Sequence, residues 1–127
     1  MSSWCGTNDL GNKEAKDILS NIIEMHSFVT KTKKAKCCII SIPEHAAEEN
    51  EKFVAITKKR EEINKRLKVL AEENTESTLY CDITKNLFQR GLSKEERDKL
   101  WCDRLHFTPK GYDIMGEEVF NTIKDWI

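Results

Sequence analysis

The stretch Cys37-Cys38-Ile39-Ile40-Ser41-Ile42, which is followed by Pro43, decides the fold class. Its residues are apolar or β-branched with almost no interruption by polar ones, and this pattern is typical of a strand buried on both faces of a parallel sheet. Pro43 ends the run because proline is a strong breaker of regular structure. We therefore predict a central parallel strand over residues 37–42.

A second strand is predicted on the C-terminal side, at Thr78-Leu79-Tyr80-Cys81-Asp82-Ile83, where β propensity is high. Residues 44–74, between the two strands, contain no Gly or Pro and form a heavily charged helix in the prediction. Its narrow apolar stripe consists of Phe53, Ile56, Ile63, Leu67 and Leu70. Strand, helix and strand in this order predict a right-handed parallel crossover.

Further elements are predicted on either side of this unit. Asn12 is a candidate cap for an amphipathic helix over residues 13–30, and residues 2–5 offer a possible strand stub. A short helix is predicted from Ser93 through Leu100. The last helix begins at Thr108-Pro109, a capping hydroxyl followed by proline at the first helical position. The apolar side of that helix is predicted to consist of Tyr112, Ile114, Met115, Val119, Phe120 and Ile123.

Helices that alternate with parallel strands predict an α/β fold. The pattern favours a flavodoxin-like doubly wound parallel sheet, which orders five strands. Only two clear strands and one stub are found, so we expect the sheet to be incomplete, with its N-terminal strands missing. An unpaired strand edge invites association, and we therefore expect self-association through the exposed sheet edge.

Length, charge and hydropathy narrow the class of protein. The 127 residues suffice for one domain, and the net charge of −1 gives no reason to expect a nucleic-acid partner. Apolar runs are far shorter than the roughly 20 residues that span a bilayer, so no membrane span is predicted. The first residues lack the features of a secretory leader, which favours a cytoplasmic protein. The five cysteines include no Cys-x-x-Cys spacing and are interpreted as free thiols. We predict no metal site and no cofactor.

One candidate site lies in Trp4-Cys5-Gly6-Thr7-Asn8-Asp9-Leu10-Gly11, between the strand stub and the first helix. Ligands bind at the carboxyl ends of the strands in α/β sheets. An Asn amide at that edge can donate to the negative charge of a tetrahedral intermediate, which makes Asn8 a candidate oxyanion donor. The same residues also suit an ordinary turn and helix cap, so this alternative stays open.

A second candidate site lies in Asp103-Arg104-Leu105-His106-Phe107-Thr108-Pro109-Lys110-Gly111-Tyr112, directly before the last helix. A carboxylate three residues before a histidine can accept a hydrogen bond from Nδ1–H, fix the tautomer and leave Nε2 free as a base. His106 is thus a candidate general base that Asp103 orients. A histidine at this place can also serve packing or bond a carbonyl group.

Together the two clusters resemble GDSL/SGNH hydrolases, a family of serine esterases and lipases. Gly6-Thr7-Asn8-Asp9 resembles the family's G-x-N-D block, and residues 103–112 are similar to its terminal D-x-x-H block with the following L-x-P-x-G-Y helix start. Ile39 to Pro43 looks like the strand and proline after the first of these blocks, and Arg60 to Asn74 like the helix before the next strand. The resemblance covers essentially the whole chain and is greatest to isoamyl acetate-hydrolysing esterases.

The resemblance implies a carboxylic ester hydrolase that works by a Ser-His-Asp mechanism on a small-molecule ester. Asn8 would be the oxyanion-hole residue, with Gly6, Thr7 and Asp9 as its supporting loop, and Asp103 and His106 the catalytic pair. The family's nucleophile block, Gly-Asp-Ser, does not occur in the sequence, nor does Gly-x-Ser-x-Gly. Residues 1–127 are therefore interpreted as the C-terminal portion of one esterase domain, inactive by itself. The alternative is a non-catalytic α/β module that binds a protein partner.

Overall fold

Three short parallel strands form the sheet of this computed structural model, which describes residues 2–3, 6–44, 54–103 and 105–127. The strands are β1 (Ser2–Ser3), β2 (Cys37–Ile40) and β3 (Thr78–Cys81), in the order β1-β2-β3. Cys38 is in register with Ser2 on one side and with Leu79 on the other. The prediction of a central parallel strand is confirmed at β2.

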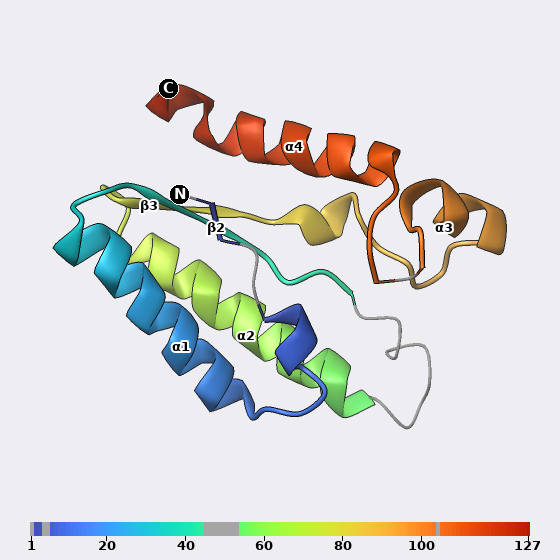
Figure 1. Cartoon of the computed structure of the whole chain (residues 1–127), viewed down its shortest axis with the longest axis horizontal. Coiled ribbons are helices and arrows are strands. Elements are labelled where there is room, and N and C mark those ends of the chain that lie inside the picture. Colours follow the sequence, from blue (N-terminus) through green and yellow to red (C-terminus); the bar gives the residue numbers. More distant parts are fainter. Residues whose placement is uncertain (1, 4–5, 45–53, 104) are drawn as a thin grey trace.

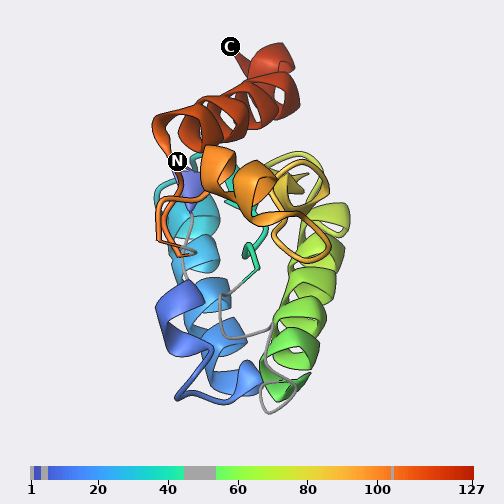
Figure 2. The ribbon, with the colours of Figure 1, turned by 90° about the vertical axis from the view of Figure 1, so that its right-hand side faces the viewer.

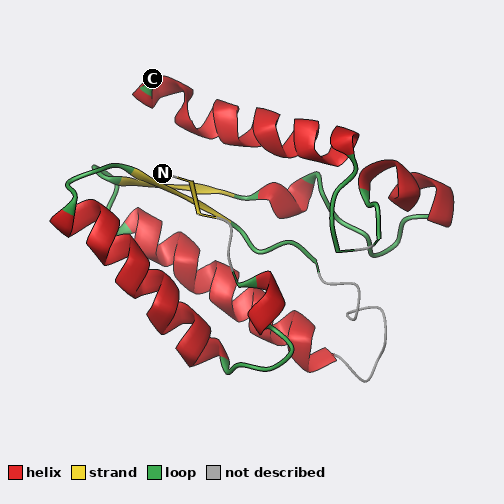
Figure 3. Ribbon diagram, in the orientation of Figure 1, coloured by secondary structure: helices red, strands yellow, loops and turns green. Residues whose placement is uncertain are grey.

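The helices cover both faces of this sheet (Figures 1 and 3). Helices α1 (Ala15–Ser27) and α2 (Val54–Glu72) lie on one side, and α4 (Pro109–Ile123) lies on the other. A π-helical turn, η2 (Phe28–Thr32), extends α1, and α3 (Lys94–Leu100) precedes α4. Short 3-10 helices follow β1, β3 and α4; they are η1 (Thr7–Asp9), η5 (Ile83–Lys85) and η6 (Lys124–Trp126). The chain is thus a mixed α/β protein with a small parallel sheet.

Strand β2 divides the apolar core into two layers. Cys37 and Ile39 pack in the layer beneath α1 and α2, whereas Cys38 and Ile40 pack in the layer that faces α4. Successive side chains of a strand point to opposite faces of the sheet, so a strand covered on both sides must be apolar throughout. All four of these side chains are buried, which explains why the sequence shows no alternation there.

Several predicted boundaries are wrong; the helix predicted over residues 44–74, for example, does not include Glu44 and ends at Glu72. Helix α1 begins at Ala15 after Glu14, and no side chain caps it, because the turn that follows η1 runs through Asn12. Strands β2 and β3 end at Ile40 and Cys81, each two residues before the predicted end. The Ser41 N–H still donates to the Cys81 carbonyl at 2.9 Å. Beyond it, side chains bond the main chain: the Ser41 hydroxyl accepts from the Ile83 N–H at 3.0 Å, and the Asp82 carboxylate accepts from the Thr84 N–H at 3.1 Å.

The predicted stripe of α2 is largely confirmed. Ile56, Ile63 and Leu67 are buried, Leu70 is half-buried, and Phe53 lies outside the described residues. Thr57 and Arg60 are buried on the same helix, although their polarity gave no reason to expect it.

Helix α4 begins as predicted, because the Thr108 hydroxyl accepts from the Gly111 N–H and Pro109 is the first helical residue. Its apolar side is only partly covered. Ile114, Met115, Val119 and Ile123 pack against the core. In contrast, Tyr112 and Phe120 are 40% and 54% exposed. The Tyr112 ring still contacts the Phe107 ring, with centroids 5.4 Å apart, so Phe120 is the more exposed of the two.

Cys37, Cys38 and Cys81 are free and buried, as the interpretation as free thiols requires. Burial raises the pKa of Cys38 to about 11, so its thiol stays protonated at neutral pH. Cys102 is free but exposed, and Cys5 lies outside the described residues. In the described part of the chain, no helix combines the length and the apolar character that crossing a bilayer requires.

Candidate functional site

The turn that carries Asp103 and His106 is fastened at its base. Trp101 and Phe107 form an antiparallel bridge, their ring centroids lie 4.5 Å apart, and both side chains are buried. The Trp101 indole N–H donates to the Phe88 carbonyl at 3.2 Å. Above this base the Cys102 N–H donates to the His106 carbonyl at 2.8 Å. Buried aromatic side chains thus anchor both ends of an exposed polar turn.

Within the turn, Asp103 and His106 form the hydrogen bond that the sequence predicts. His106 Nδ1 lies 2.7 Å from Asp103 Oδ2, and Asp103 Oδ1 accepts from the main-chain N–H groups of His106 and Leu105 at 2.7 and 3.0 Å. These hydrogen bonds lower the pKa of Asp103 to about 2, so its carboxylate is ionised at neutral pH. An ionised carboxylate at Nδ1 favours the tautomer with a free Nε2, the atom that a general base uses.

The start of α4 fits tightly against the end of α3. The Thr108 hydroxyl donates to the Lys99 carbonyl at 2.6 Å, and the Thr108 N–H donates to the Leu100 carbonyl at 2.9 Å. A Cβ atom on Gly111 would stand 2.4 Å from the Leu100 carbonyl oxygen and 2.9 Å from Phe107 Cβ. Only glycine at position 111 therefore lets α4 come this close to Leu100 and Phe107. This contact sets the position of the base of the turn.

We expect Gly111→Ala to lower the free energy of unfolding by about 1–3 kcal/mol, the usual cost of overpacking a tight site. Gly116 of the same helix is the matched control, because a Cβ there would meet nothing within 4 Å. Gly116→Ala should raise stability by about 0.5–1 kcal/mol, since alanine favours the helix. Urea unfolding of both variants measures the two changes in unfolding free energy, which should have opposite signs. Equal changes would contradict the close approach of Gly111 to Leu100 and Phe107.

The loop that carries Asn8 follows β1. Gly6 adopts φ 104° and ψ −22°, a left-handed conformation that favours glycine, and its carbonyl accepts from the Asp9 N–H at 3.1 Å to begin η1. A Cβ on Gly6 would also stand 2.8 Å from Ile42 Cδ1. Asn8 is exposed, and Asp9 pairs with Lys13 at 3.1 Å. The Thr7 hydroxyl is buried and has no hydrogen-bond partner among the described residues.

Helix η1 and the turn between α3 and α4 lie at the same end of the sheet. Figure 1 shows both beyond the carboxyl ends of the strands, and Figure 2, which looks onto that end, shows both facing the viewer. Ligands bind at this edge of open α/β sheets. Within the described ranges, no group of three His, Cys, Asp or Glu side chains could hold a metal ion.

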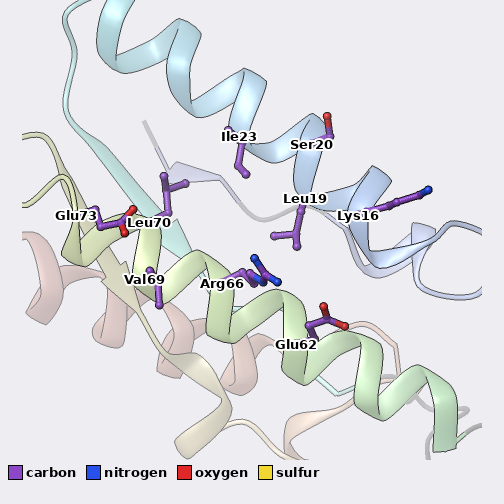
Figure 4. Close-up of a pocket in the computed structure, with 9 residues that line it drawn as sticks. All are labelled: Lys16, Leu19, Ser20, Ile23, Glu62, Arg66, Val69, Leu70 and Glu73. Atoms are coloured by element: carbon purple, nitrogen blue, oxygen red, sulfur yellow. The ribbon is translucent and has the colours of Figure 1, made fainter.

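A groove of about 600 Å³ lies elsewhere, between α1 and α2 (Figure 4). Its apolar walls come from Leu19, Ile23, Val69 and Leu70, and its polar rim consists of Lys16, Ser20, Glu62, Arg66 and Glu73. None of these is a predicted site residue, so the groove is separate from the candidate site.

Two α2 residues that sequence reasoning did not single out contact the segments around Asn8. The Asn64 amide accepts from the Ile42 N–H at 2.7 Å and donates to the Ile42 carbonyl at 2.9 Å. Lys59 Nζ donates to the carbonyl groups of Leu10 and Lys13 at 2.9 and 2.6 Å. The partners are 22 or more residues apart in sequence, so no local signal reveals these contacts.

Neither a family model nor a curated protein matches the chain. One solved structure does: a protein from Streptococcus pneumonia, provisionally named a platelet activating factor, at 22% identity and a TM-score of 0.69. The match covers 98% of this chain and 57% of that one, so the chain spans little more than half of its neighbour. At this identity the likeness concerns the fold, and the chain has the α/β architecture of the matched part.

Proposed function

We propose that the chain is the C-terminal portion of an SGNH-type carboxylic ester hydrolase with an incomplete flavodoxin-like sheet. The observation that carries the proposal is the 2.7 Å hydrogen bond between Asp103 and His106, on a turn that Trp101 and Phe107 anchor at the carboxyl end of the sheet. The match covers only 57% of the neighbour's chain, which supports an incomplete domain. The buried free thiols favour a reducing, cytoplasmic setting.

In the proposed reaction, a serine outside these 127 residues attacks the ester carbonyl carbon. His106 takes the serine proton on Nε2 and later gives it to the leaving alkoxide, while Asp103 stabilises the charged imidazolium. Asn8 donates its amide N–H to the oxyanion of the tetrahedral intermediate. Water then attacks the acyl-enzyme by the same steps and releases the carboxylic acid.

The test compares the chain alone with a protein in which it is joined to the N-terminal, Gly-Asp-Ser-bearing segment of a related esterase. The chain alone should hydrolyse a short-chain aryl ester barely above buffer, because it lacks the Gly-Asp-Ser block that carries the nucleophile. The joined protein should hydrolyse it rapidly. Rapid turnover and serine-probe labelling of the chain alone would show that an unrecognised serine is the nucleophile.

A binding module is the alternative, and the exposed apolar side chains on and after α4 favour it. Phe120 is 54% exposed and Ile127 is 81% exposed. Such side chains beside an open sheet edge suit association with a partner or a second copy. If the joined protein folds but stays inactive while the chain alone is oligomeric by sedimentation, the alternative replaces the esterase proposal.

A further inference from the structure

Lys59 links α2 directly to the loop that carries Asn8. Its ammonium group donates to the Leu10 carbonyl at 2.9 Å and to the Lys13 carbonyl at 2.6 Å. The Leu10 side chain is fully buried, so the core holds one of the two residues whose carbonyl groups Lys59 contacts. A lysine ammonium offers three donors, and two of them meet carbonyl groups that follow η1. Hydrogen bonds from a charged donor are roughly twice as strong as neutral ones.

A second set of contacts, from Asn64 of α2, reaches the same loop at its other end. Asn64 bonds both main-chain groups of Ile42, and the side chain of Ile42 lies beneath Gly6. Gly6 precedes η1, whereas Leu10 and Lys13 follow it. The two α2 residues therefore support the loop before and after Asn8. Of the two, Lys59 contacts the loop itself, and it is only half-buried, so replacing it leaves the core intact.

Asn8 depends on this support because its side chain is exposed, so packing against the core does not fix it. The direction of its amide therefore follows from the main chain of η1. A displacement of about 1 Å at a catalytic group costs roughly 10²-fold in rate. A contact that fixes the main chain around Asn8 thus affects the reaction without touching the substrate.

We propose that Lys59 is a positioning residue, which sets the direction of the Asn8 amide by holding the carbonyl groups of Leu10 and Lys13. The inference rests on the proposed function, and it concerns a residue that neither candidate cluster contains. Lys59 acts through the loop, so its removal changes the rate of the chemical step more than it changes substrate binding.

The first arm of the test uses the chain alone and needs no activity. In Lys59→Met, the hydrogen-bonded amides of Asp9, Leu10, Asn12 and Lys13 should exchange with solvent roughly 10–100-fold faster, the effect of losing hydrogen bonds to a charged group. Amides of β2 should exchange unchanged. Lys58→Met is the matched control, because Lys58 is the exposed neighbour on the same helix. If Lys59→Met fails to fold, Lys59→Gln, which cannot span both carbonyl groups, replaces it.

The second arm uses the joined protein. Lys59→Met should lower kcat roughly 10–100-fold with KM unchanged, Lys58→Met should have no effect, and Lys59→Arg should recover part of the loss. Unchanged exchange at residues 9–13 in Lys59→Met would overturn the proposal, as would equal kcat values for the two methionine variants. An inactive joined wild type would reject the proposed function, whereas the exchange arm would still decide whether Lys59 holds the loop.

Discussion

Replacing His106 with alanine in the joined protein is expected to lower kcat roughly 10²–10⁴-fold, the contribution of a positioned general base. The imidazole is the base that the proposal assigns to the serine proton, and its Nδ1 is already held by Asp103 at 2.7 Å. Steady-state hydrolysis of a short-chain aryl ester measures the effect.

Lys110→Ala is the matched control for this experiment, because Lys110 lies in the same block of sequence and is exposed. Its rate should equal that of the joined wild type. Both variants should keep the melting temperature of the parent, since the His106 side chain is 61% exposed and Lys110 is exposed as well. If His106→Ala retained half of the wild-type rate, the assignment of the general base would have to be abandoned.

Replacing Asn8 with alanine should cost roughly 10²–10³-fold in kcat, as the loss of one oxyanion donor does elsewhere. In the role proposed for it, the Asn8 amide stabilises charge that exists only in the transition state, so KM should change little. The measurement is kcat and KM in the joined protein. Asn12→Ala is the control, because Asn12 is an exposed residue of the turn that follows η1. Equal rates for Asn8→Ala and Asn12→Ala would show that Asn8 serves only the turn.

The parts of the fold that depend on neighbouring residues could be predicted from the sequence. The continuous apolar run at Cys37–Ile40 identifies a strand covered on both faces, and Thr108-Pro109 identifies the start of α4. The bond between Asp103 and His106 spans one turn, so the spacing alone suggested it. In each case the physical cause lies within a few residues of its effect.

The parts that depend on tertiary contacts could not be predicted. Ser41 and Asp82 shorten the strands because their side chains bond the main chain of η5. The contacts of Lys59 join residues 49 and 46 positions apart. Phe120 is exposed because the small sheet does not cover the whole apolar side of α4. None of these depends on periodicity or on a capping pattern.

The closure of the turn by Trp101 and Phe107 also has a consequence for the order of folding. Contacts between residues close in sequence form early, because closing a short loop costs little chain entropy. The bridge between Trp101 and Phe107 and the bond between Asp103 and His106 are such contacts, whereas the pairing of β2 with β3 joins residues 41 positions apart. We therefore expect the hydrogen bond between Asp103 and His106 to form early in folding, before the slower parallel pairing of β2 with β3.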